Sequence, residues 1–286
     1  MSKDRSKSRS RTRASGRGDG APIHARWGRL HQTDREPWPD ERHVSELARA
    51  HPRLEPAIES QGGSAATAAA IVAAWGAFHA GEFARAIEAG DALGALGAAP
   101  ANKAAAVAAL YAVRGSDPLG ELEAAIERGE RAVSSLSDLA NVHYTLALVL
   151  GRYSQRISIL QALAAGLGGR VRAHLERALA LEPRHAEAHL AFGLFHAEII
   201  AKLGSLAASL TYGASAAEAL EHFRRARALA PDSPIVRMEY ANGLMLLDAA
   251  RHRAQAEKLY AEAAACEPAD AMERLDVARA RRGLPR

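Results

Sequence analysis

Apolar and small residues recur in the second half of the chain at spacings that place them on one face of a helix. Three of these segments end in the same pattern. In each, apolar or small residues stand twelve, eight and five positions before a proline. The positions are Val171, Leu175 and Ala178 before Pro183, then Ala219, Phe223 and Ala226 before Pro231, then Ala256, Tyr260 and Ala263 before Pro268. Because proline lacks an amide hydrogen and clashes with a helical turn, the pattern predicts similar helices, each closed by a proline.

A second motif recurs earlier in the chain. Residues 81–87 read Gly-Glu-Phe-x-x-Ala-Ile, and residues 120–126 read Gly-Glu-Leu-x-x-Ala-Ile. Internal similarity at a period of this length is typical of helical solenoids. Together the two motifs resemble the turn and second helix of the tetratricopeptide repeat. The resemblance implies an all-α, right-handed helical solenoid of helix-turn-helix units.

Alignment on the closing prolines divides the repeat domain, residues 64–286, into five units and one more helix. The units are 65–98, 100–135, 138–183, 186–231 and 234–268, and the last helix is 269–282. An open stack of repeats needs a helix of this kind to cover its final apolar face. Gly193 supplies the small residue that the first helix of its unit requires, and Ala241 does the same in the next unit.

The residues before the repeats divide into two parts. Residues 1–40 are rich in arginine, serine, glycine and proline and show no periodic apolar positions, which predicts a disordered basic tail. Residues 41–63 are expected to form a short helical lead-in and linker. Asp40 is its predicted N-cap, and Val44 and Leu47 are predicted to face inward.

Two neighbouring units are about a dozen residues too long. In both, the extra residues lie between the two helices, at 153–169 and 201–215, and they are apolar and interrupted by glycines. Inserts in adjacent repeats emerge on the same side of a stack, so these two can pack on each other. An exposed apolar patch of this kind is a candidate partner site.

These long units also carry a family resemblance. The stretch Ala-Ser-Leu-Thr-Tyr-Gly-Ala-Ser at 208–215 and the helix that follows it, with Ala-Leu-Glu-His-Phe at 219–223, resemble the regulator of microtubule dynamics family over about residues 140–267. Animal members of that family are described as microtubule-associated. The Ala-, Arg- and Gly-rich composition is typical of a bacterial protein instead, so we expect only the architecture to carry over.

The concave face of a tetratricopeptide stack is lined by the first helices of the units, and six residues map to its binding positions. They are Asn141, Tyr144 and Arg152 in the third unit, Glu187 and Glu198 in the fourth, and Asn242 in the fifth. Such side chains can clamp the backbone of an extended peptide. Exposed helix positions are polar in any case, and this alternative is equally compatible with the sequence.

Charge is concentrated at one end of the chain. Residues 1–17 hold seven basic residues against Asp4, whereas the net charge of the whole chain is +4, so the rest is near neutral. Such a tail can associate weakly with nucleic acid or an anionic membrane, or it is simply solvated. The uncharged stretch 60–81 is diluted by Ala, Gly, Ser and Thr, and we expect no transmembrane segment. A single cysteine, Cys266, favours a cytoplasmic location.

The sequence offers little support for catalysis or metal binding. His185 and His189 superficially resemble a zinc motif, but Glu187 does not follow the first histidine directly, as the protease helix requires. His143, His196 and Glu198 match no catalytic pattern. We therefore predict a non-enzymatic protein that needs no cofactor and binds a protein or peptide through the groove, the paired inserts or both. The alternative is nucleic-acid or anionic-membrane association through the basic tail.

Overall fold

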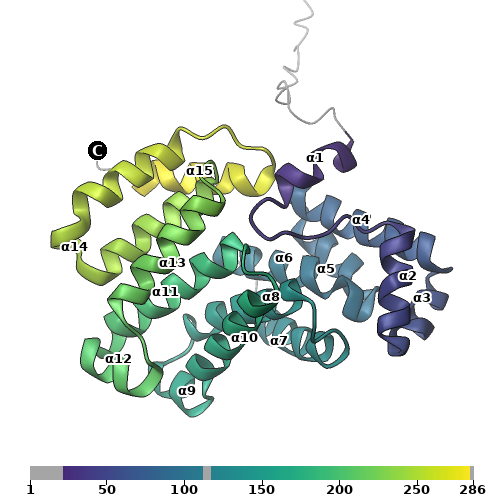
Figure 1. Cartoon of the computed structure of the whole chain (residues 1–286), viewed down its shortest axis with the longest axis horizontal. Helices are drawn as coiled ribbons and strands as arrows, with labels where there is room; N and C mark the ends of the chain where they lie inside the picture. The colour runs from purple at the N-terminus through teal and green to yellow at the C-terminus, as the bar shows by residue number, and fades with distance from the viewer. Residues whose placement is uncertain (1–21, 112–116, 284–286) are drawn as a thin grey trace, which may run out of the picture.

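The computed structural model describes residues 22–111 and 117–283, and within these ranges every regular element is a helix (Figure 1). Ten helical segments form five successive pairs. The pairs are α4 (Ser64–Ala80) with α5 (Phe83–Asp91), α6 (Ala98–Leu110) with α7 (Pro118–Ser135), α8 (Ala140–Ser154) with α10 (Leu167–Leu181), α11 (Ala186–Leu203) with α13 (Ala216–Leu229), and the two halves of α14 (Pro234–Ala264), which meet at the non-helical Asp248. The predicted all-α solenoid of helix pairs is confirmed.

Small residues allow the pairs to pack closely, as the alignment of the repeats predicts. The ring of Phe223 on α13 lies between Gly193 of α11 and Gly243 of α14. A β-carbon at either glycine would come within 2.6 Å of the Phe223 ring, so neither helix could carry a side chain there. The ring also stacks on Tyr240, with 5.0 Å between the ring centroids.

The solenoid curls until its last helix meets its first. Helix α15 (Ala271–Gly283) packs on α14, as expected for a terminal helix, and also contacts α4. His79 of α4 is hydrogen-bonded to Asp270, which lies just before α15, and Met272 and Leu275 pack against the first hydrophobic core. In Figure 1 the yellow C-terminal helix lies beside the purple N-terminal one.

The prediction of a disordered tail as far as residue 40 is wrong from residue 22 onward. Residues Ile23–Leu30 form α1, which buries Trp27, and the chain then runs along the inner face of the solenoid. Ile23 and Trp27 are one helical turn apart and pack into the first core, and polar contacts with distant helices hold the residues that follow α1. The basic residues 1–17 lie outside the described residues.

The lead-in also belongs to the first core. Helix α2 (Glu41–Ala50) begins at Asp40, whose side chain accepts a hydrogen bond from the amide of His43, and it packs on α4 with Val44 fully buried. The short helix α3 (Glu55–Ser60) follows, and Gly62 and Gly63 then turn the chain with positive φ angles. The predicted linker is thus a tight connection to α4.

Candidate functional site

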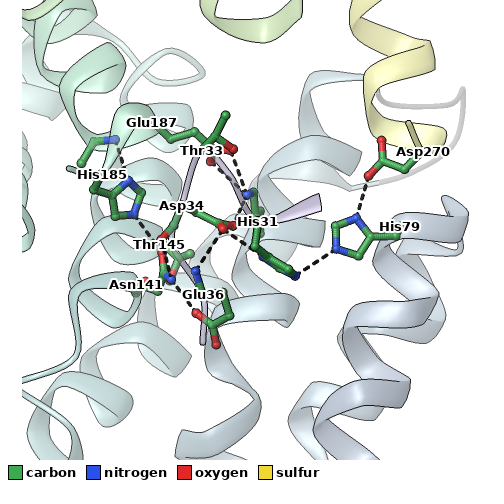
Figure 2. Close-up of polar contacts among 12 residues, drawn as sticks. His31, Thr33, Asp34, Glu36, His79, Asn141, Thr145, His185, Glu187 and Asp270 are labelled. Atoms are coloured by element: carbon green, nitrogen blue, oxygen red, sulfur yellow. Dashed lines mark hydrogen bonds and ion pairs between the residues drawn. The ribbon is translucent and has the colours of Figure 1, made fainter. Parts of the chain in front are cut away.

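The first helices of the repeats, together with α15, surround a central cavity of about 110 Å³. Residues 31–36, here called the inner loop, lie across this inner face between α1 and α2 (Figure 2). Its His31, Thr33 and Asp34 are buried. The concave face of the solenoid is therefore already in contact with a segment of its own chain.

Two residues of the predicted groove hold the backbone of the inner loop. The Asn141 Nδ2 atom donates a hydrogen bond to the carbonyl oxygen of Asp34 at 3.0 Å, and the backbone amide of Glu187 donates one to the carbonyl of Thr33 at 3.1 Å. The Thr33 hydroxyl in turn donates to a Glu187 carboxylate oxygen at 2.5 Å. These are main-chain contacts of the type by which a groove holds an extended peptide.

The orientation of Asn141 is set by His185, the N-cap of α11. The amide of Ala188 donates to His185 Nδ1, so the proton of this ring is on Nε2 and points at the Asn141 Oδ1 atom, 2.9 Å away. Burial lowers the pKa of His185 to about 4, which keeps the ring neutral. The Asn141 amino group is thereby directed at the inner loop, where it also donates to the Glu36 carboxylate.

Lys103 of α6 provides the charge that complements the loop. Its ammonium group lies 2.6 Å from a carboxylate oxygen of Asp34 and 3.0 Å from Glu187, and all three residues are buried. Burial opposes ionisation of Asp34, but Lys103 and His31 together hold the pKa of this carboxyl well below its usual range. The pKa of Lys103 is raised by the two carboxylates in spite of its burial.

A chain of hydrogen bonds links Asp34 to the C-terminal helix. Asp34 contacts His31 Nδ1 at 2.9 Å, His31 Nε2 contacts His79 Nε2 at 3.2 Å, and His79 Nδ1 contacts Asp270 at 2.6 Å (Figure 2). Burial lowers the pKa of His79, against the effect of its hydrogen bond with Asp270. The chain joins the inner loop through α4 to the residue that precedes α15.

Two tryptophans close the base of the inner loop. The rings of Trp27 and Trp38 meet edge to face with 5.0 Å between their centroids, and the Trp27 indole donates to the carbonyl of Glu36 at 2.9 Å. Within the loop, Arg35 has a φ of 57°, and no other non-glycine residue in the described ranges has a positive φ. Residues 31–37 thus form a short loop between α1 and Trp38 whose two ends are held together.

The six predicted groove residues fall into three places. Asn141 and Glu187 contact the inner loop, and Tyr144 is buried beside them with its ring 4.5 Å from that of His185. Burial first, and then Glu187, raises the pKa of Tyr144 well above its usual value. Arg152 and Glu198 lie farther along the groove and are joined through Gln155, and Asn242 contacts Glu239 and Tyr260 within the last repeat. That any of them binds a peptide of another molecule stays a prediction.

The two inserts flank a second hollow, here called the insert cleft. Helices α9 (Ile159–Ala164) and α12 (Ser205–Tyr212) lie on the same side of the molecule (Figure 1). The cleft has a volume of about 280 Å³, and its apolar lining includes Ile157, Ile159, Leu163, Phe195, Ile199 and Tyr212. On the same two helices, Leu160, Leu206 and Leu210 do not line the cleft and are 75–80% exposed. The inserts therefore enclose a hollow and also present leucines to solvent.

Four other histidines form two pairs, each within one repeat. His143 and His174 are in contact through their Nδ1 atoms at 3.0 Å, and His189 and His222 form the equivalent pair in the next repeat at 2.9 Å. His185 and His189 thus have different partners, and His143, His196 and Glu198 do not converge. No group of three or more His, Cys, Asp or Glu side chains in the described part of the chain is arranged to hold a metal ion.

Sequence reasoning missed His31, Thr33, Asp34, His79 and Lys103. The first three lie in a segment without helical periodicity, and their partners are 48 to 154 positions away in the chain. Lys103 carried a usable signal, since it is a single charge in an otherwise uncharged, alanine-rich helix. A lone lysine in such a helix requires a buried anion, although the sequence does not say which.

Comparison with known proteins agrees with this architecture. The arrangement of helix pairs defines a helical repeat protein of the tetratricopeptide type, and it resembles the crystal structure of a thermophilic TPR protein of Thermus thermophilus with a TM-score of 0.54. That match has 18% sequence identity and covers 75% of this chain and 98% of the other, so it supports the fold alone. No match was found among the curated proteins.

The family follows from the sequence of the later repeats. Residues 121–282 match the family model described as regulator of microtubule dynamics protein 1-3. This region is more than half of the chain, and the protein therefore belongs to that family. The resemblance stated from residues 140–267 is confirmed and extends to α7 and α15. Within the described residues, none of the helices is sufficiently long and apolar to cross a membrane.

Proposed function

We propose that this protein is a non-catalytic scaffold that binds a protein partner through the insert cleft and the exposed leucines of the two inserts. The observation that supports this most directly is the set of Leu160, Leu206 and Leu210 on two neighbouring inserts. Exposed leucines on two neighbouring helices, next to an apolar cleft, form the kind of surface that marks a site of protein interaction. The concave groove is less accessible, because the inner loop already contacts its central residues.

The inserts carry no charge between residues 157 and 169 or between 203 and 217. A surface of this kind recognises its partner by apolar burial, and covering one leucine side chain contributes about 1.5–3 kcal/mol. The fitting partner is an apolar face, such as one side of an amphipathic helix. Arg152 and Lys202 at the cleft can pair with acidic groups that flank that face.

The test is a triple variant, Leu160→Glu/Leu206→Glu/Leu210→Glu, compared with the wild-type protein. Partners would be captured from cells of the source organism after chemical crosslinking and identified by quantitative mass spectrometry. We expect the amount of partner captured by the triple variant to be at least tenfold lower than that captured by the wild type, because three charges would have to be buried in the interface. All three positions are exposed, so the fold is retained, and circular dichroism checks this.

A matched control is Leu246→Glu, which changes an exposed leucine of α14 that lies outside both inserts. This variant should keep the partners. Equal loss in the triple variant and the control, or no loss in either, would contradict a docking role of the inserts.

The location of the protein and the role of its basic tail are separate parts of the proposal. A cytoplasmic location and weak nucleic-acid contact through residues 1–17 remain predictions. Deletion of these residues, followed by nucleic-acid binding assays at low and high salt, tests the tail, since contacts with phosphate weaken steeply as salt rises.

A further inference from the structure

We propose that the inner loop, residues 31–36, is a displaceable internal ligand of the concave groove, and that the groove binds in its place an extended acidic peptide from a partner protein. This is a second binding surface, independent of the insert cleft. It assigns to the groove a ligand class, a peptide with the pattern Thr-Asp-x-Glu, and it assigns to the inner loop the role of occupying that site.

The contacts of the loop are those of a bound peptide. Two backbone carbonyls, of Thr33 and Asp34, receive hydrogen bonds from Glu187 and Asn141, and the side chain of Asp34 meets Lys103. Each of these groove groups belongs to the first helix of a different repeat, α6, α8 or α11. A peptide from another molecule can supply the same carbonyls and the same carboxylate.

Cavities adjoin the loop after His31, which itself packs on Trp27 and Trp75. The central cavity of about 110 Å³ adjoins Gln32 and Thr33, and another cavity of about 200 Å³ adjoins Asp34, Arg35 and Glu36. The side-chain nitrogen of Gln32 is buried without a hydrogen-bond partner. Segments that bury few apolar contacts open with lower free energy than the core around them.

Two features of the loop oppose its docking. The left-handed backbone conformation of Arg35 is a strained one for a non-glycine residue. Burial, and then the charge of Asp34, raises the pKa of Glu36 to about 7, so this carboxylate is held at a cost when it is ionised. Both costs disappear when the loop leaves the groove.

The loop can leave without unfolding the elements next to it. Trp27 and Trp38 hold its ends together and pack into the first core, which also contains Trp75. Residues 31–37 can therefore swing out as one unit, in the manner of a compact surface loop whose ends are close, while α1 stays in place. In this open state Lys103, Asn141 and Glu187 become available to a partner.

The class of ligand follows from the charged and polar groups that the groove presents once the inner loop has left it. Lys103 then faces only Glu187, and the amino group of Asn141 lacks both of its acceptors. An incoming peptide must present a carboxylate to Lys103, a backbone carbonyl to Asn141 and a hydroxyl to Glu187. A basic peptide would leave Lys103 opposed by a like charge.

The experiment uses a fluorescein-labelled peptide of residues 30–37 as the probe, with full-length protein. In the wild-type chain the tethered loop competes at an effective concentration of about millimolar or higher, so the peptide should bind poorly. In the variant Asp34→Ala the loop loses its contact with Lys103, whereas Lys103 keeps Glu187 as a partner. We expect the peptide to bind this variant at least tenfold more tightly than the wild type.

Two controls establish where the peptide binds. A peptide with Asp34→Asn should bind the Asp34→Ala protein at least tenfold more weakly than the parent peptide, and adding Asn141→Ala to the protein should weaken binding further. The insert variant Leu160→Glu/Leu206→Glu/Leu210→Glu, combined with Asp34→Ala, should bind the peptide normally. A failure of the insert proposal is thereby separated from a failure of this one.

Hydrogen exchange of the wild-type protein gives a test that needs no variant. The amide of Glu187 donates to the loop carbonyl of Thr33, so its exchange reports release of the loop. We expect the Glu187 amide to exchange faster than the amides inside α8. The free energy of the opening that exposes it should depend only weakly on denaturant concentration. Exchange of this amide only through global unfolding, or equal binding of both peptides to a correctly folded Asp34→Ala protein, would overturn the proposal.

Discussion

At the scale of single residues, Lys103 is the charge on which the inner site depends. It stands in a helix composed mainly of alanine and is buried between Asp34 and Glu187. A buried ion pair adds little net stability compared with an apolar replacement of all its members, but removing one member leaves an uncompensated buried charge. Loss of Lys103 would therefore leave both Asp34 and Glu187 without a counter-ion.

We expect Lys103→Met to lower the free energy of unfolding by about 3–5 kcal/mol, because two buried carboxylates lose their counter-ion. Urea titration at neutral pH measures the effect. The control is Lys258→Met on the exposed face of α14, which has no ion pair among the described contacts and should change stability by less than about 0.5 kcal/mol. Similar losses in the two variants would contradict the role of Lys103.

The histidine pairs predict a dependence of stability on pH. His143 and His189 each donate from Nε2 to a backbone carbonyl, so their Nδ1 atoms accept from His174 and His222, and each pair is neutral. Burial, and then the paired ring, lowers the pKa of both His174 and His222 to about 4. Unfolded histidine has a pKa near about 6.5, so the stabilisation is complete above that pH and is lost as the pH falls toward 4.

The measurement is the urea midpoint between pH 7 and pH 4. The variant His174→Asn/His222→Asn keeps a donor in place of each Nδ1 proton but cannot titrate, so its midpoint should fall less steeply than that of the wild type. Identical slopes in the two proteins would show that the pairs do not set the acid sensitivity.

At the scale of elements, close packing between successive repeats depends on where glycine stands. Gly243 on α14 faces the Phe223 ring, and a β-carbon there would lie 2.1 Å from it. Gly151 on α8 is also helical but has no atom within 4 Å of such a β-carbon. The two positions are chemically alike and differ only in what the neighbouring repeat places against them.

We expect Gly243→Ala to destabilise the protein by about 1–3 kcal/mol through overpacking. Gly151→Ala should instead stabilise it by about 0.5–1 kcal/mol, because alanine restricts the unfolded chain and favours a helix. Thermal and urea unfolding of both variants provide the comparison. A loss at Gly151 as large as that at Gly243 would mean that helix propensity, rather than contact with Phe223, decides the result.

The helices themselves were largely readable from the chain. The closing prolines, the Gly-Glu motif that begins in the turn at Gly81, and the small residues mark local conditions for helix ends and close packing, which is why the repeats were predicted. The second copy of that motif, at Gly120, lies inside α7. The structure of residues 22–40 was not predicted, because it depends on tertiary partners such as Lys103 and Asn141 rather than on the periodicity of these residues alone. The groove residues lie on first helices, as the repeat pattern predicted. Their contact with the inner loop was not predicted, because it depends on tertiary partners.

At the scale of the whole molecule, the solenoid is closed by polar contacts between its ends. Arg29 forms two hydrogen bonds to Glu273, at 2.7 and 2.9 Å, and His79 binds Asp270. These contacts join α1 and α4 to α15, across more than 190 positions of sequence. A repeat array whose units contact only their neighbours would otherwise be free to bend.

We expect Asp270→Ala/Glu273→Ala to loosen this closure. Spin labels on the exposed positions Glu88 and Lys258, in a Cys266→Ser background, report the distance between the first and last repeats by electron–electron resonance. The distance distribution should become longer and broader than in the parent protein. The control Glu46→Ala removes one side of an exposed ion pair with Arg42 and should leave the distribution unchanged. An unaltered distribution in the double variant would mean that apolar packing of Met272 and Leu275 suffices.

The sequence by itself determined the helices, their pairing into repeats, the excess length of two of them and the family. These follow from short-range conditions, since helix ends, turns and small-residue contacts are set by residues a few positions apart. Only the tertiary structure decided that the ends of the solenoid meet and that the inner loop lies in the groove. Both depend on single hydrogen bonds and ion pairs between residues far apart in the chain, which leave no periodic trace in one sequence.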